Sequence, residues 1–244
     1  MRFDVFTLFP DVFSPYLNSS ILHRAQEMGS LQVDVHNIRD WATDKHQVTD
    51  EPPYGGGGGM VMKPEPIFSA VEEIMGNPPE APVVLMTPQG RTLNHKTALV
   101  LSENSRMAII AGHYEGIDER VREHLVTDEI SIGDYVLTGG ELPAMVLIDV
   151  LTRLIPGVLG DPSAAENDSH ASGLLEYPHF TRPEEFRDWV VPEILRSGHH
   201  ARIERWRRNQ ALKRTYERRP DLLSNLELSE EDQNFLDQLD NEGS

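Results

Sequence analysis

Short segments that favour β-strands alternate with helix-like segments through the first half of the chain, and no other feature constrains the fold as much. Four segments have the composition of buried strands: residues 3–9, 31–38, 82–86 and 107–111. Three helix candidates lie between them: residues 18–28, 65–75 and 97–103. This alternation favours an α/β fold with a mostly parallel sheet and helices on its faces. Ligands of such sheets bind beyond the carboxyl ends of the strands.

The sequence changes character after Pro156-Gly157, and we place a domain boundary there. Residues 161–173 are small and polar, as expected of a mobile linker. The predicted parts are an α/β domain over residues 1–160, a flexible linker over 161–173 and a small helical domain over 174–244. Within the last part, residues 199–219 have a strong helix pattern that ends at Pro220. Ser229 resembles the first residue of a capping box that opens a final acidic helix.

Positive charge is concentrated in one segment of an acidic chain. The net charge of −18 argues against a nucleic-acid partner, because Lys and Arg dominate phosphate binding. However, residues 182–219 hold 11 of the 22 Lys and Arg side chains and only 6 Asp and Glu. Such asymmetry is typical of a polyanion-binding segment, and a solvated arginine-rich helix face is the alternative.

The composition is that of a folded protein in a reducing compartment. Hydrophobic residues make up 39% of the chain and charged residues 25%. No run reaches the roughly 18 consecutive apolar residues that would span a bilayer, and the first residues lack a signal-peptide pattern. The absence of cysteine excludes disulfides, thiolate nucleophiles and zinc–thiolate sites. We therefore expect a cytoplasmic protein without a membrane partner.

The densest pattern of chemical interest runs from residue 112 to residue 143. It reads GHYEGIDER directly after the fourth predicted strand, and SIGDYVLTGGELP from Ser131 onward. Glycines after a strand let a ligand approach the backbone, whose N–H and C=O groups can recognise an adenine edge or a ribose. The stretch contains no GxxxxGK[ST] phosphate loop and no dinucleotide fingerprint. It therefore favours a nucleoside-like ligand held by backbone groups, and a pair of tight turns is the alternative.

A second glycine segment follows Pro53-Tyr54 and consists of five consecutive glycines, Gly55 to Gly59. Such a run cannot form the interior of a helix or a strand. It is either a flexible spacer or a loop that closes over a ligand. Two neighbouring side chains would give it a function, Asp50 as an acceptor and Tyr54 as a stacking surface for a base.

One pair of side chains could supply acid–base chemistry. Asp168 lies in the predicted linker, and Arg153 lies at the end of an apolar helix predicted over residues 141–155. The carboxylate could take a proton while a nearby guanidinium stabilises negative charge on a substrate oxygen, and a solvated linker aspartate is the alternative. His179 is either a substrate contact or part of the packing of the last domain. Without an HExxH pair or cysteines, we predict no metal-ligating residues.

Taken in chain order, these segments closely resemble the TrmD family of bacterial tRNA (guanine-N1)-methyltransferases, in the knotted SPOUT class. The resemblance covers residues 1 to about 220 and rests on this series: LFPDVF, Arg39-Asp40, the Asp50 to Met60 loop, Pro88-Gln-Gly-Arg91, GHYEGIDER, SIGDYVLTGGELPA, IPGVLG, EYPHFTRP and VPEILRSGHHARIERWR. An ordered series of this kind is far more specific than any single motif.

The resemblance implies S-adenosylmethionine as methyl donor and the guanosine at position 37 of tRNA as acceptor. It implies a C-terminal trefoil knot in the α/β domain, a rare exception to the rule that chains do not thread loops. It also implies a homodimer whose active site combines both chains, and a helical domain that binds tRNA rather than DNA. A requirement for Mg²⁺ is implied as well, although no residue in the sequence indicates its site.

The resemblance also assigns individual residues. The donor would be held by these positions: Thr87, Pro88, Gln89, Gly112, Tyr114, Glu115, Ile132, Gly133, Asp134, Tyr135, Val136, Leu137, Gly139 and Gly140. Asp168 would remove the proton from guanine N1, and Arg153 would stabilise the charge that moves onto O6. The substrate contacts would be Asp50, Tyr54, His179 and Arg182.

Some positions depart from the common family pattern. His113 stands where arginine is frequent, and Gly58 stands where proline is frequent. The linker spacing also differs, so Asp168 is aligned backwards from Gly173, and Asp161 is its nearest competitor. These departures concern loop rigidity and tRNA contacts rather than the reaction. Two other functions stay open: a SPOUT relative that modifies another RNA nucleotide, and a non-catalytic RNA-binding adaptor.

Overall fold

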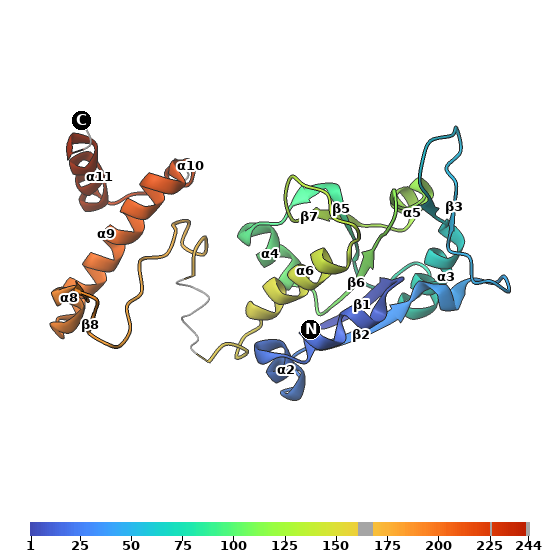
Figure 1. Ribbon diagram of the computed structural model, residues 1–244, viewed down its shortest axis with the longest axis horizontal. Helices are drawn as coiled ribbons and strands as arrows, with labels where there is room; N and C mark the ends of the chain where they lie inside the picture. Colours follow the sequence, from blue (N-terminus) through green and yellow to red (C-terminus); the bar gives the residue numbers. More distant parts are fainter. Residues whose placement is uncertain (161–167, 225, 243–244) are drawn as a thin grey trace. The chain divides into compact units, whose positions relative to one another are not determined.

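The protein consists of two compact units, Met1–Gly160 and Asp161–Ser244, in a computed structural model (Figure 1). The structure describes residues 1–160, 168–224 and 226–242. Most of the predicted linker, residues 161–167, therefore lies outside the described residues. Its last part, residues 168–173, forms turns in which the Ala171 N–H donates to the Asp168 carbonyl at 3.1 Å.

A five-stranded sheet forms the centre of the first unit, with strand order β2-β1-β6-β5-β7 and every neighbouring pair parallel. Its strands are β1 (Arg2–Thr7), β2 (Gln32–Asn37), β5 (Val83–Thr92), β6 (Arg106–Ala111) and β7 (Asp128–Ser131). The predicted α/β class and parallel sheet are confirmed. The four predicted strands are present, whereas β7 was not predicted.

Helices cover both faces of this sheet (Figure 1). Alternate strand residues point to opposite faces, so Val5 and Ile109 join one core cluster while Phe6 and Ile110 join the other. The first cluster is completed by α2 (Ser20–Glu27), α4 (His95–Ser102) and α6 (Glu141–Arg153), and the second by α3 (Pro64–Met75) and α5 (Glu119–His124). Two buried faces explain why the central segments Val83–Met86 and Met107–Ala111 are apolar at every position.

The smaller elements of the first unit lie in its connections. They are η1 (Pro10–Val12), α1 (Ser14–Leu17), η2 (Ile38–Trp41), β3 (Asp50–Glu51) and β4 (Val61–Met62). The predicted first strand thus ends at Thr7, because Pro10 has no N–H to donate and begins a short 3-10 helix instead.

Strand β5 leaves the sheet and returns to it. Met86 and Arg91 both pair with Ile130 of β7, so residues 87–90 bulge out of the ladder between them. Gly90 allows this return, because a Cβ at that position would lie 2.4 Å from the carbonyl carbon of Glu129. The bulge therefore interrupts the pairing of β5 with β7 between Met86 and Arg91.

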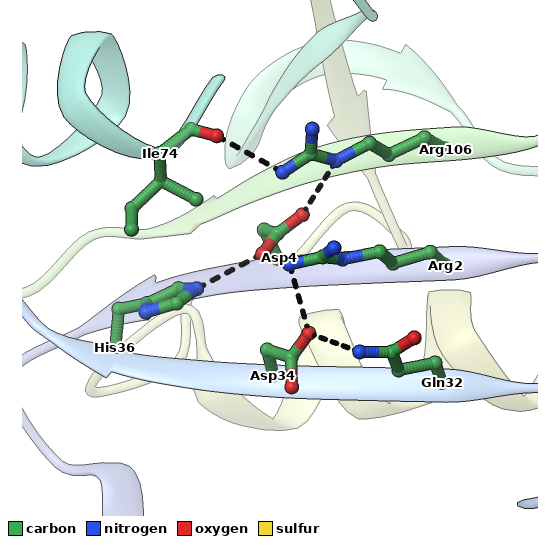
Figure 2. Close-up of polar contacts among 7 residues, drawn as sticks. All are labelled: Arg2, Asp4, Gln32, Asp34, His36, Ile74 and Arg106. Carbon is green, nitrogen blue, oxygen red and sulfur yellow. Dashed lines mark hydrogen bonds and ion pairs between the residues drawn. The ribbon is translucent and has the colours of Figure 1, made fainter. Parts of the chain in front are cut away.

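A buried ionic cluster joins β1 to its two neighbouring strands, β2 and β6 (Figure 2). The Asp4 side chain is 0% exposed and accepts hydrogen bonds from Arg2 at 3.0 Å, from Arg106 at 2.9 Å and from His36 Nε2 at 3.0 Å. Arg106 also donates to the Ile74 carbonyl at 3.0 Å. Burial raises the pKa of Asp4, but the hydrogen bonds from His36, Arg106 and Arg2 outweigh it and hold the pKa below its ordinary value.

The second unit is built on the long helix α9 (His200–Arg218). Its other elements are β8 (Glu185–Phe186), β9 (Trp189–Val190), α8 (Glu193–Arg196), α10 (Pro220–Leu223) and α11 (Glu230–Glu242). Leu212 of α9 and Leu236 of α11 are buried in its small core. The predicted helix boundaries are nearly correct, and the Asp232 N–H donates to Ser229 Oγ at 3.1 Å, as the capping box requires.

Candidate functional site

One cavity lies beyond the carboxyl ends of β5, β6 and β7, where a parallel sheet is expected to bind its ligand. Three loops form its wall, around residues 87–89, 112–117 and 131–140. All the residues predicted to hold the donor line this cavity except Asp134. The structure thus brings together three segments that are far apart in the sequence.

The loop that follows β6 is packed against the start of α6. The Gly140 N–H donates to the Gly112 carbonyl at 2.7 Å. A Cβ on Gly140 would lie 2.8 Å from the Ala111 Cα and 2.9 Å from the Gly112 nitrogen, and both of these atoms belong to the backbone. Only glycine permits this approach, which explains why the motif has a glycine pair before α6.

The loop that follows β7 ends in exposed apolar side chains. Ser131 fixes its start, because its hydroxyl accepts from the Gly133 N–H at 3.2 Å and donates to the Gly133 carbonyl at 3.0 Å. Tyr135, Val136 and Leu137 follow, and Val136 is 80% exposed although it lines the cavity. Exposed apolar side chains at a cavity rim are typical of a surface that a ligand or a partner covers.

His113 joins the cavity to a neighbouring apolar groove. Its ring centroid lies 4.8 Å from that of Phe9 and 5.0 Å from that of Tyr114. Its Nδ1 is buried without a hydrogen-bond partner among the described residues and lies 3.8 Å from a Glu141 carboxylate oxygen. Glu141 is itself buried and accepts from the Thr7 hydroxyl at 2.8 Å. The groove is lined by Phe9, Val12, His113, Glu141, Leu142 and Met145.

The five-glycine loop connects β3 to β4 and is tied at its second end to the cavity wall. The Glu115 N–H donates to the Met60 carbonyl at 3.0 Å, and the Met62 N–H donates to the Gly116 carbonyl at 2.9 Å. Gly59 packs so closely that a Cβ would lie 2.3 Å from a Glu115 carboxylate oxygen. Tyr54 is fully exposed at the other end of the loop, and Asp50 in β3 is half-buried.

The two side chains predicted to carry the acid–base chemistry lie in different units. Arg153 is the last residue of α6 and does not line the cavity, and Asp168 belongs to the second unit. His179 Nε2 lies 2.7 Å from Glu176 Oε1, and Arg182 is exposed. The catalytic and substrate-binding roles of these side chains stay predictions.

Several arginines of the basic segment are used inside the second unit. Arg205 and Arg208 both donate to the Asp232 carboxylate at 2.9 Å. Burial raises the pKa of Asp232, but its bonds to Arg208 and Arg205 outweigh this effect and lower the pKa overall. The Arg207 guanidinium lies 4.9 Å from the Tyr177 ring centroid. Part of the positive charge of the basic segment therefore stabilises the second unit itself. Neither interpretation of the sequence, a polyanion-binding segment or a solvated helix face, included this use.

Arg122 was missed by the sequence analysis although it lines the cavity. It lies on α5, a helix of only six residues that gave no recognisable apolar pattern. Its guanidinium donates to Thr87 Oγ1 at 3.0 Å and to the Gln89 side-chain oxygen. The only available signal was a second arginine two residues after the GHYEGIDER motif, which by itself indicates no role.

The described residues do not form a metal site. Across residues 1–160, 168–224 and 226–242, no group of three or more His, Asp or Glu could hold a metal ion. The expected Mg²⁺ therefore has no protein-built site in this part of the chain, and we assign no step to it. No helix in the same ranges is long and apolar enough to cross a membrane.

Comparison with known proteins gives one consistent result. The family model described as tRNA (Guanine-1)-methyltransferase TrmD matches residues 1–225. A tRNA (guanine-N(1)-)-methyltransferase of Dehalococcoides mccartyi is 56% identical over 98% of this chain and 97% of its own length. Proteins with the same name from Moorella thermoacetica and Brevibacillus brevis are 57% and 56% identical, over 98% and 99% of this chain and 96% and 99% of their own lengths.

Proposed function

The chain belongs to the TrmD family of tRNA (guanine-N1)-methyltransferases, and from this premise we propose that it methylates N1 of the guanosine at position 37 of tRNA with S-adenosylmethionine. The observation that carries the proposal is the cavity beyond β5, β6 and β7, whose wall contains all but one of the residues that the family pattern assigns to the donor. We further propose a cytoplasmic location, where tRNA is modified.

The cavity suits S-adenosylmethionine because its walls offer backbone groups and apolar side chains rather than a phosphate site. Gly112, Gly139 and Gly140 bring the backbone close to a ligand, as recognition of an adenine edge or a ribose requires. The exposed side chains of Tyr135, Val136 and Leu137 would cover the apolar faces of the bound nucleoside. The donor supplies the methyl group, and its sulfonium leaves as a neutral thioether.

We propose that the bulge of β5 and the loop after β7 belong to the family's trefoil knot. Supporting this assignment, Met86 and Arg91 share the partner Ile130, so the chain leaves the sheet and returns at one point. Gly140 packs against the Gly112 backbone at the neighbouring strand. A knotted wall would hold three separate loops at fixed distances, which is what a site built from backbone groups needs.

Asp168 and Arg153 are proposed to carry the chemistry on guanine. The N1 proton has a pKa well above neutrality, so its removal needs a base, and Asp168 would act as that base when tRNA binds. The negative charge that develops moves onto O6, where the Arg153 guanidinium would stabilise it. Asp50, Tyr54, His179 and Arg182 would contact the tRNA, together with arginines of the second unit that do not serve its packing.

We propose that the protein works as a homodimer whose active site combines both chains. Apolar and aromatic side chains are exposed on α6 and on the segment after β1, and we call this surface the α6 apolar face: Phe9, Val12, Tyr16, Leu142 and Val146. Tyr16 donates to Asp149 of α6, which joins the two segments. This face adjoins the donor cavity through His113, so a second chain seated on it would lie next to the donor.

The proposed reaction is tested by transfer of labelled methyl groups. Incubation with labelled S-adenosylmethionine should place the label on N1 of guanosine 37 in a tRNA transcript, and a transcript with adenosine at that position should take up none. Label at another nucleotide would identify a SPOUT relative with a different target. Absence of donor binding would instead support the RNA-binding adaptor.

The assignment of Asp168 is tested by separating binding from turnover. Asp168→Asn should bind S-adenosylmethionine with the wild-type Kd and lose about 100-fold or more in kcat. Asp161→Asn is the matched control and should keep full turnover. A result in which Asp161→Asn is inactive and Asp168→Asn is active would transfer the role of base to Asp161.

The homodimer is tested by placing a charge on the α6 apolar face. Val146→Asp should shift the protein from dimer to monomer in sedimentation at micromolar concentration and abolish turnover. Glu123→Gln, on the exposed side of α5, is the control and should stay dimeric. A monomeric wild type that methylates tRNA would contradict the proposal.

A further inference from the structure

The bulge of β5 supplies one wall of the cavity, yet most of it has little support from the sheet. Residues 87–90 lie outside the β5–β7 ladder, and Pro88 and Gln89 are exposed. Its base is fixed where Gly90 packs on the Glu129 backbone. Within the bulge, the Gln89 N–H donates to Thr87 Oγ1 at 3.3 Å, a bond that shapes the turn without attaching it to a neighbouring element.

Arg122 connects this bulge to α5. One terminal nitrogen of its guanidinium donates to Thr87 Oγ1 at 3.0 Å, and the other donates to the Gln89 side-chain oxygen. The fork thus holds the first and the third residues of the bulge at once. Only arginine has two terminal nitrogens in a fixed plane, so a lysine could hold just one of the two acceptors.

Two acidic side chains lie near the guanidinium. Its Nε lies 3.6 Å from a Glu129 carboxylate oxygen, and a terminal nitrogen lies 3.9 Å from a Glu119 carboxylate oxygen. The Arg122 side chain is only 19% exposed. Its bond to Thr87 is partly shielded from water, and charge-assisted hydrogen bonds of this kind are stronger than neutral ones.

We propose that Arg122 is a positioning residue that holds residues 87–89 against the bound methyl donor. The inference rests on the proposed function, namely that the cavity binds S-adenosylmethionine. Arg122 acts on the donor through Thr87 and Gln89, because its two hydrogen-bonding nitrogens are engaged by the bulge. Loss of the fork frees this wall while the loops after β6 and β7 stay in place, so the donor binds more weakly and the chemistry on guanine is unchanged.

The first experiment compares two substitutions at this position by steady-state kinetics with tRNA in excess. Arg122→Met should raise the KM for S-adenosylmethionine about tenfold and leave kcat at saturating donor within about twofold. Arg122→Lys should recover part of the loss, with a KM about threefold above wild type. Glu123→Gln, an exposed neighbour on the same helix, is the control for the helix itself. If kcat fell by as large a factor as KM rose in both Arg122 variants, and their Tm was lowered, Arg122 would have a general structural role and the proposal would be wrong.

The second experiment asks whether Arg122 acts through Thr87. The Kd of S-adenosylmethionine is measured by calorimetry for Arg122→Met, Thr87→Val and the double variant. If the hydroxyl is the attachment point, the effects of the two substitutions on Kd should fall clearly short of multiplying, because both remove the same Arg122–Thr87 bond. Effects that multiply would show that Arg122 does not work through Thr87, and a wild-type Kd for Arg122→Met would also overturn the inference. Failure of the wild type to bind the donor would instead refute the proposed function.

Discussion

The two ends of the central sheet differ in their side chains: one holds buried charges, and the other surrounds a cavity. In its amino half, Asp4 is completely buried and accepts hydrogen bonds from Arg2, His36 and Arg106 (Figure 2). At its carboxyl ends, glycines and exposed apolar side chains surround an open cavity. One sheet therefore carries a buried ionic cluster on β1, β2 and β6 and a cavity at the carboxyl ends of β5, β6 and β7.

This difference shows where the fold gains its stability and where it keeps its capacity to bind. A buried carboxylate tolerates removal from water only when hydrogen bonds and opposite charges replace the water, as Arg2, Arg106 and His36 do for Asp4. A ligand site needs the reverse, namely surface that the protein does not cover with its own side chains. Val136 meets this need by its exposure, and Gly140 lets two segments of the cavity wall pack backbone to backbone.

The largest effect is expected from breaking the ionic cluster. Asp4→Ala leaves two arginines and a histidine without their shared acceptor and should lower the free energy of unfolding by about 3 kcal/mol. Urea unfolding at pH 7 measures this change. Asp34→Ala is the matched control on the neighbouring strand, since its side chain is 36% exposed and should contribute 1 kcal/mol or less, on the order of a surface pair.

Donor binding by the folded Asp4 variant should not change. At a temperature well below its unfolding transition, Asp4→Ala should bind S-adenosylmethionine with an unchanged Kd, because no residue of β1 lines the cavity at the carboxyl ends of β5, β6 and β7. A large loss of donor affinity in folded Asp4→Ala would mean that the two ends are coupled.

An intermediate effect is expected from filling the cavity wall. Gly140→Ala places a methyl group against the backbone of Ala111 and Gly112 and should raise the Kd of S-adenosylmethionine at least tenfold, or about 1.4 kcal/mol. Calorimetric titration measures the change. Gly160→Ala is the control, because no described atom lies within 4 Å of a Cβ built there. Wild-type affinity in folded Gly140→Ala would remove this glycine from the site.

A smaller effect on the free energy of unfolding is expected when the pH is lowered. The pKa of Asp4 is lowered in the folded protein, so its stabilising contribution is complete above the unfolded value of about 3.9 and is lost as the pH falls through the folded value. The difference in unfolding free energy between wild type and Asp4→Asn should therefore stay constant from pH 7 to about pH 5 and shrink below about pH 4. A difference that does not change at all as the pH falls below about 4 would show that the carboxylate charge is not its source.

Much of the sheet and the cavity could be predicted from the sequence because both have local signals. The apolar run that ends at Ala111 predicted β6, and the glycines directly after it predicted a ligand loop. Strand β7 escaped prediction because it begins with Asp128 and Glu129, and the apolar environment that orders it comes from β5, far away in the sequence. Its core residue Ile130 is recognisable only once that pairing is known.

The contacts that complete the site could not be predicted, because they join distant segments. Glu141 binds Thr7 across 134 positions of sequence, and Arg122 binds Thr87 across 35. In the basic segment, composition indicated charge but not its use, since two arginines are held by Asp232 within the same unit. Periodicity reports which face of an element is buried, whereas such bonds depend on how whole elements are arranged.

The central claim is that the carboxyl ends of β5, β6 and β7 form the methyl-donor site, and hydrogen–deuterium exchange with and without S-adenosylmethionine tests it most directly. Amides in residues 87–91, 112–117 and 131–140 should exchange more slowly when the donor is added. Amides around the ionic cluster, in residues 2–4, 32–34 and 106–108, should exchange at unchanged rates. Protection confined to the amino half of the sheet or to the second unit, with none in the three loops, would contradict the account.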